Sequence, residues 1–84
     1  MIYWRTWPNL GYAVLYYGEA TIARVQYERA LVFHIEVMGV YQGFENHMRK
    51  AQDVALRIAT RLRYIPRIPV KISPADDGNV IHLA

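Results

Sequence analysis

The feature that most constrains the fold is a repeat of apolar residues at spacings of three and four. Its members are Phe44, Met48, Ala51, Ala55, Ile58, Leu62 and Ile65. This spacing is the period of one helical face, so the sequence predicts an amphipathic helix over residues 43–64. Pro66 follows at once, and a proline cannot continue the hydrogen-bond ladder of a helix. A helix of this length can cover one face of a sheet.

The preceding residues alternate between apolar and polar side chains, which is the period of strands with one buried face. The cleanest run is residues 31–37, in which Leu31, Phe33, Ile35 and Val37 face one way and His34 and Glu36 the other. Further β-prone runs occupy residues 2–7, 12–17 and 21–27. Turn residues separate the first three of these runs, at 8–11 and at Gly18.

A competing interpretation makes residues 19–38 one long helix, because many of its residues are tolerable helix formers. The link at residues 28–30 also lacks the Asn-Gly or Asp-Gly expected of a tight hairpin. The clean alternation of residues 31–37 and their β-branched and aromatic content favour strands instead.

The predicted architecture is α+β, in a single small domain over residues 1–84. An antiparallel meander of three to four strands within residues 2–38 packs on one long amphipathic helix. Residues 66–84 form a C-terminal extended segment or short hairpin, with an edge strand at 70–72, a turn at 73–79 and a final strand at 80–83, or else a tail. The predicted core joins the apolar side chains of residues 31–37 to the apolar face of the helix.

Composition excludes several classes of site. The chain has no cysteine, which removes disulfides, thiolate zinc sites and cysteine nucleophiles. Its first residues lack the basic and apolar regions of a signal peptide, and charges interrupt every apolar run before it reaches membrane-spanning length. We therefore expect a cytoplasmic, intracellular protein without membrane contact.

Residues suited to catalysis are few and scattered. His34 and Glu36 share the outer face of a predicted strand, where they could orient a proton transfer or begin a metal site. No third ligand or nucleophile accompanies them in sequence, which favours a polar pair on a solvated face over a functional site. The glycines occur singly, so no phosphate-binding loop is present. We expect a non-enzyme with no catalytic residue, metal or small-molecule cofactor.

Aromatic residues are more numerous than one small core can hold, since the chain has seven tyrosines and two tryptophans. Tyr and Trp are enriched at protein interfaces, because they bury much area at little entropic cost. The predicted interface residues are Tyr3, Trp4, Trp7, Tyr12, Tyr16, Tyr17 and Leu56, the last an apolar residue on the charged side of the helix. Alternatively, these rings pave the edges and ends of a small fold.

The net charge of +3 lies on the helix, where five basic residues oppose Glu45 and Asp53. They are Arg49, Lys50, Arg57, Arg61 and Arg63. Such a face can bind nucleic acid or an acidic protein surface. Asp53 lies one turn from Arg49 and Arg57, however, and such pairs also occur on ordinary solvated helices.

The function we expect is a small protein-binding module whose partner is another protein or a second copy in a homodimer. Inhibitors and adaptors of larger machines, including counter-defence proteins of mobile elements, belong to this class. The basic helix face is expected at the rim of the aromatic surface. The alternative is a nucleic-acid-binding module that uses the basic helix face. Base stacking on the sheet is disfavoured, because the outward residues from Arg24 to Glu36 are mixed in charge.

Overall fold

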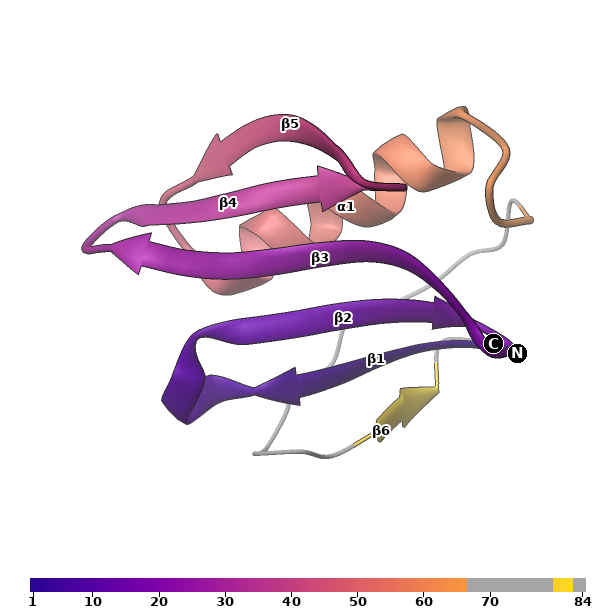
Figure 1. Cartoon of the computed structure of the whole chain (residues 1–84), viewed down its shortest axis with the longest axis horizontal. Helices are drawn as coiled ribbons and strands as arrows, with labels where there is room; N and C mark the ends of the chain where they lie inside the picture. Colours follow the sequence, from indigo (N-terminus) through magenta and orange to yellow (C-terminus); the bar gives the residue numbers. More distant parts are fainter. Residues whose placement is uncertain (67–79, 83–84) are drawn as a thin grey trace.

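The computed structural model describes residues 1–66 and 80–82, which form one antiparallel sheet with one helix. The strands are β1 (Ile2–Trp7), β2 (Tyr12–Tyr17), β3 (Ala20–Arg29), β4 (Val32–Val37), β5 (Val40–Glu45) and β6 (Val80–His82). A 3-10 turn, η1 (Pro8–Leu10), joins β1 to β2, and the helix is α1 (Met48–Arg61). The sheet order is β5-β4-β3-β2-β1-β6 (Figure 1). The predicted α+β meander on one helix is confirmed, with five consecutive strands instead of three to four.

Tight turns connect the long strands of the meander. Met38 and Gly39 both have positive φ, 49° and 79°, which is the twist that a two-residue hairpin loop requires. The β3–β4 turn contains no glycine and instead places Leu31 in the left-handed region at φ 64°. The link at residues 28–30 therefore closes a hairpin without the usual turn residues. The prediction that residues 19–38 form strands, and not one long helix, is correct.

The start of the helix was predicted five residues too early. Residues 40–45 pair with β4 as strand β5, and α1 begins only at Met48. His47 is the N-cap, with extended backbone, and its Nδ1 accepts a hydrogen bond from the Arg49 amide at 3.1 Å. Phe44, a predicted core residue, consequently lies on a strand with 57% of its surface exposed.

The helix packs across β3, β4 and β5 and covers one face of that half of the sheet (Figure 1). The prediction that Ala51 and Ala55 meet Ile35 and Val37 is confirmed, since all four are buried in one cluster. Ala59 belongs to the same cluster, and three alanines in this stripe allow the helix backbone to approach the sheet closely.

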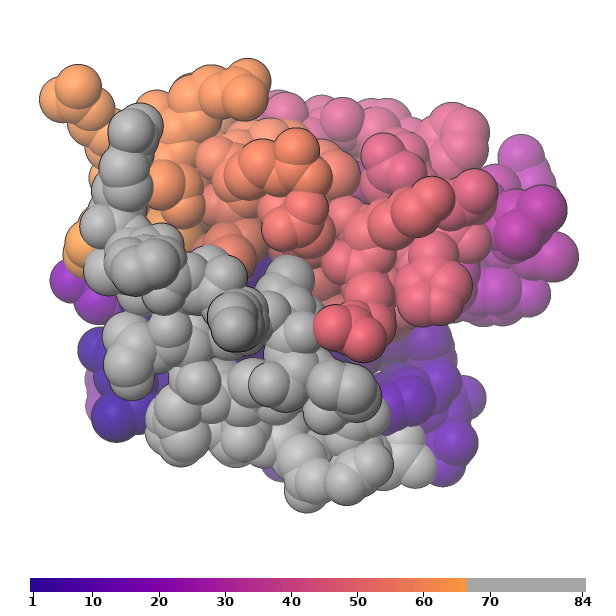
Figure 2. All heavy atoms as spheres, turned by 180° about the vertical axis from the view of Figure 1, so that it is seen from behind, coloured from indigo at the N-terminus to yellow at the C-terminus, as the bar shows by residue number. Residues whose placement is uncertain are grey.

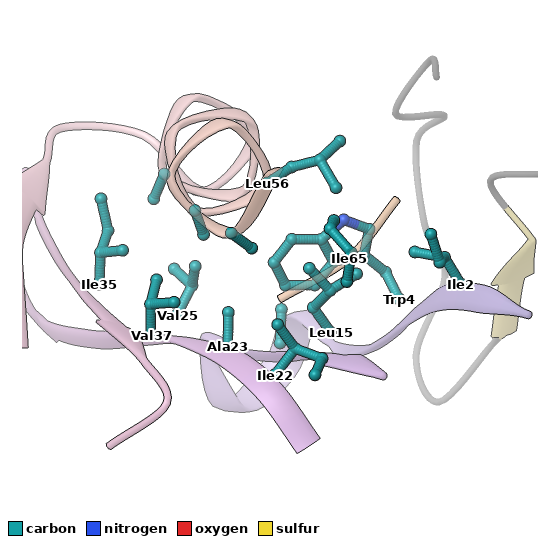
Figure 3. Packing of buried hydrophobic residues seen from close by; sticks show 14 residues of the cluster. Ile2, Trp4, Leu15, Ile22, Ala23, Val25, Ile35, Val37, Leu56 and Ile65 are labelled. Carbon is teal, nitrogen blue, oxygen red and sulfur yellow. The ribbon is translucent and has the colours of Figure 1, made fainter. Parts of the chain in front are cut away.

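The buried stripe of the helix is rotated from the predicted one, toward Gln52, Leu56 and Ala59. Leu62, predicted to be inside, caps the helix and is half exposed, and Leu31 lies outside the core in its turn. Met48 and Ile58 pack against the cluster while partly buried. The rotation brings Leu56 over Trp4 and Ile65, which fill the core beyond the helix (Figure 3).

The final strand is also as predicted at residues 80–82, where β6 pairs with β1 in antiparallel register. This pairing brings the C-terminal part of the chain beside its N-terminal strand (Figure 1). The predicted edge strand at 70–72 and turn at 73–79 lie outside the described residues.

Candidate binding face of the sheet

Within residues 1–66 and 80–82, no helix lies across the face of the sheet opposite α1, and we call this face the open face. Figure 1 looks onto it, with α1 behind β3, β4 and β5. Paired residues on adjacent strands share a face, so the register assigns its members. Within residues 1–66 they are Tyr3, Arg5, Trp7, Tyr12, Val14, Tyr16, Thr21, Arg24, Gln26, His34, Glu36, Tyr41 and Phe44.

Four aromatic side chains form two cross-strand pairs on β1 and β2. Tyr3 lies opposite Tyr16, and their rings stack with centroids 5.1 Å apart and planes inclined by 20°. Trp7 lies opposite Tyr12, with centroids 5.5 Å apart. All four are half-buried, so each ring is braced by its neighbour and still reaches solvent. We call Tyr3, Trp7, Tyr12 and Tyr16 the aromatic quartet.

Val14 lies at the centre of the quartet. It is paired with Arg5 on one side and Arg24 on the other, and Tyr12 and Tyr16 flank it along β2. Only 3% of its surface is exposed, although it points away from the helix and is not a member of the main core cluster. Val14 is thus a buried apolar residue on the open face, outside the main core cluster.

Arg5 and Arg24, the two arginines paired with Val14, make different contacts. The guanidinium carbon of Arg5 lies 4.9 Å from the centroid of the Trp7 ring, a cation–π contact. Arg24 Nε lies 3.9 Å from a carboxylate oxygen of Glu36, with both side chains about half exposed. This ion pair is long and solvated, so it contributes little stability and leaves both groups available to a partner.

The β4 side of the open face is polar. His34 Nε2 lies 2.8 Å from a carboxylate oxygen of Glu28, and the His34 ring meets the Tyr41 ring edge-on at 5.3 Å. The pair considered from the sequence, His34 with Glu36, is therefore divided between two other partners. Within the described residues, no group of three or more His, Asp or Glu side chains is placed to hold a metal ion.

Three of the predicted interface residues do not belong to this face. Trp4 is fully buried and Leu56 is 5% exposed, and both belong to the core cluster (Figure 3). Their assignment to an interface is wrong, because alternation along β1 turns Trp4 inward and the helix rotation covers Leu56. Tyr17 is exposed but pairs with the buried Ile2, so it lies on the helix side of the sheet.

The basic helix residues also lie on the helix side, which Figure 2 shows from behind. Arg49, Lys50, Arg57, Arg61 and Arg63 are all exposed. Arg57 forms an ion pair with Asp53, as the sequence predicts. Arg61 and Arg63 line a hollow together with Tyr17 and Tyr64. They do not rim the aromatic quartet as expected, because α1 and the quartet occupy opposite faces of the sheet.

Sequence reasoning missed Arg5 and Val14 as members of the candidate face. Both were visible as alternate positions of β-prone runs, but their importance depends on the β1–β2 register. That register sets Arg5 opposite Val14 and the aromatic rings on either side. Pairing of distant residues, and not periodicity within one strand, assembles this surface.

No helix within the described part of the chain is long and apolar enough to cross a membrane. Searches against protein-family models, curated proteins and solved structures find no match.

Proposed function

We propose that this protein is a small non-catalytic protein-binding module, acting as an inhibitor or adaptor, and that the open face is its binding surface. The observation that carries the proposal is the aromatic quartet around Val14 and Arg5. It joins four half-buried Tyr and Trp rings to an arginine that makes no ion pair within residues 1–66 and 80–82.

The residue types support protein binding. Tyr, Trp and Arg are the residues most enriched among those that dominate binding energy, and Lys is depleted at interfaces. None of the residues that the register assigns to the open face within residues 1–66 is a lysine. The open face thus presents the aromatic and arginine side chains that contribute most to binding energy at protein interfaces.

The quartet is also held in place before any partner arrives. Tyr3 stacks on Tyr16, Trp7 packs on Tyr12, and Arg5 lies over Trp7. Immobilising a free side chain on binding costs about 0.5–1.5 kcal/mol of conformational entropy. Side chains that are already ordered lose less. Preorganisation therefore favours binding at this half of the sheet.

The test is site-specific photocrosslinking in the cells that produce the protein. A benzophenone amino acid replaces Tyr12 on the open face, and in a matched variant it replaces Arg57 on the helix face. The proposal expects a discrete protein adduct at Tyr12 and none at Arg57, with the partner identified by mass spectrometry. Adducts at Arg57 alone would place the binding surface on the helix and contradict the proposal.

Titration with the purified partner then measures how much the aromatic quartet contributes to the binding affinity. Trp7→Ala is expected to weaken binding by about 30-fold or more, because truncation of a central aromatic side chain costs about 2 kcal/mol or more. Arg57→Ala is the control and is expected to leave the affinity within about twofold. Equal affinities of the Trp7→Ala variant and the unmodified protein would contradict the assignment.

Nucleic-acid binding by the helix is the second candidate. The observation that favours it is the exposure of five basic side chains on one side of the molecule, with Asp53 as the one acidic residue within α1. Basic side chains that replace phosphate counterions produce binding that falls steeply with added salt.

A gel-shift or anisotropy titration with a generic DNA and RNA duplex tests this candidate at low and moderate salt. A complex that salt dissolves and that Arg57→Glu with Arg61→Glu abolishes would support it. Binding indifferent to both changes would exclude the basic helix face as the site. Arg5→Glu is the matched charge change on the opposite face and is expected to have a much smaller effect.

A further inference from the structure

We infer that the open face binds a second copy of this chain, so that two sheets pack face to face in a symmetric dimer. The inference rests on the proposed function and names its partner. It is carried by the distribution of charge across the open face, which complements itself when the face is turned over.

The charged residues of the open face differ between its two sides, because β1 carries Arg5 alone, whereas β3 and β4 carry Arg24 together with carboxylates. Arg5 lies on β1, and within the described residues its recorded contact is the Trp7 ring and not a carboxylate. Of the two carboxylates on the other side, Glu28 lies at the end of β3, where it contacts His34 of the open face, and Glu36 lies on β4. Their side chains are 46% and 42% exposed, so they remain open to a partner.

A twofold axis parallel to the strands, lying between β2 and β3, matches these two sides. It sets β1 of one copy over β4 of the other, and β2 over β3. Since Arg5 and Glu36 belong to the same row of paired residues, this operation places Arg5 over Glu36 of the second copy, twice. Sheets stacked with strands aligned to within about 30° pack about 10 Å apart, a distance that these long side chains span.

The neighbouring row is equally complementary. It runs from Trp7 through Tyr12 and Gln26 to His34. The same axis lays Trp7 over His34 of the second copy and Tyr12 over Gln26. Aromatic faces then meet imidazole and amide groups, and no like charges are opposed in this row. The aromatic side of one copy is thus covered by the polar side of the other.

A nucleic acid fits this face less well than a second copy. A strand crossing the open face would meet Glu28 and Glu36, whose charges repel phosphate. A second copy uses both sides of the face, because it brings a carboxylate to Arg5 and an arginine to Glu36. Charge complementarity of this kind sets orientation and suppresses wrong partners.

The area of the face predicts a weak dimer. Four strands of each copy overlap in this arrangement, and strands about 4.8 Å apart and about 20 Å long give them a footprint of about 19 by 20 Å, below the area of a standard stable interface. We therefore expect association in the micromolar range, with monomer and dimer in exchange.

Light scattering behind size exclusion, or analytical ultracentrifugation, tests the inference over about 1 µM to 1 mM protein. The expected result is a concentration-dependent monomer–dimer equilibrium. Arg5→Glu and Glu36→Arg are each expected to weaken it at least tenfold, because each sets two like charges together. Asp53→Arg is the control on the helix face and is expected to leave the equilibrium unchanged. Thermal unfolding verifies that every variant is folded.

Mixing the two variants is the decisive measurement. An equimolar mixture of Arg5→Glu and Glu36→Arg chains contains the opposite charges across both contacts and is expected to form a heterodimer with nearly the original affinity. A monomer at every concentration would overturn the inference, as would a dimer that ignores both substitutions or a mixture that stays monomeric. These results do not decide the proposed function, which the crosslinking experiment tests separately. In that experiment, a different protein captured at Tyr12 would support the open face as the binding surface and exclude self-association.

Discussion

Val14 and Leu15 are consecutive in β2 and point to opposite faces of the sheet, yet 3% and 0% of their surfaces are exposed. Leu15 belongs to the main core cluster, on the helix side of the sheet. Val14 lies on the open face, between Arg5 of β1 and Arg24 of β3. The open face is therefore partly packed in the free protein, which distinguishes it from an ordinary solvated sheet surface.

Truncation of these two residues compares the contributions of the main core and of the open face to the free energy of unfolding. Leu15→Ala is expected to lower the free energy of unfolding by about 2–5 kcal/mol. Val14→Ala is expected to cost less, about 1.5 kcal/mol from about 0.8 kcal/mol per methyl group removed. Urea unfolding followed by circular dichroism measures both. A Val14→Ala variant as stable as the original protein would show that Val14 is not packed by its neighbours.

Gly11 occupies a position where a side chain is excluded twice. Its φ of 62° is left-handed, and a Cβ there would collide with Cβ of Tyr27, whose amide donates a hydrogen bond to the Gly11 carbonyl at 2.7 Å. Gly18 has the same φ with open space around it, so it is the matched control. Gly18→Ala is expected to cost about 1–2 kcal/mol from backbone conformation, and Gly11→Ala clearly more. Equal losses in urea unfolding would contradict the clash.

Gln52 is a polar residue in the core. It is 2% exposed, and its amide nitrogen has no hydrogen-bond partner within the described part of the chain. Because a buried donor without a partner costs about 1–3 kcal/mol, Gln52→Met is expected to raise the free energy of unfolding by about 1 kcal/mol. The same change at the exposed Gln42 is expected to stay within about 0.5 kcal/mol. A destabilised Gln52→Met variant would indicate that the amide is satisfied.

His47 begins α1 through a hydrogen bond accepted from the Arg49 amide. His47→Ala removes this cap and is expected to lower the free energy of unfolding by about 1 kcal/mol. His47→Asp retains an acceptor and adds a negative charge at the helix N-terminus, so it is expected to exceed the original stability by about 0.5 kcal/mol. Chemical denaturation of both variants measures the order. An Ala variant as stable as the Asp variant would show that the cap is unimportant.

The sequence also led to errors, and these occur where one residue satisfies two patterns. Phe44 continues the helical repeat, but it equally suits a strand, and pairing of residues 40–45 with β4 decides the outcome. In β1, alternation divides Ile2, Trp4 and Thr6 from Tyr3, Arg5 and Trp7, and each set contains a tryptophan. Periodicity alone does not reveal which set is buried.

The sequence by itself determined the α+β class, the strands within residues 2–38 and the burial of Ala51 and Ala55, whereas α1 ends at Arg61, three residues before the predicted end. The class, the strands and the buried alanines follow from local periodicity, which acts within a few residues of the chain. Only the tertiary structure decided where the aromatic residues lie. Cross-strand register gathers the aromatic quartet around Val14 on the open face, and helix rotation buries Leu56 over Trp4. Both depend on contacts between distant residues, whose geometry no local pattern contains.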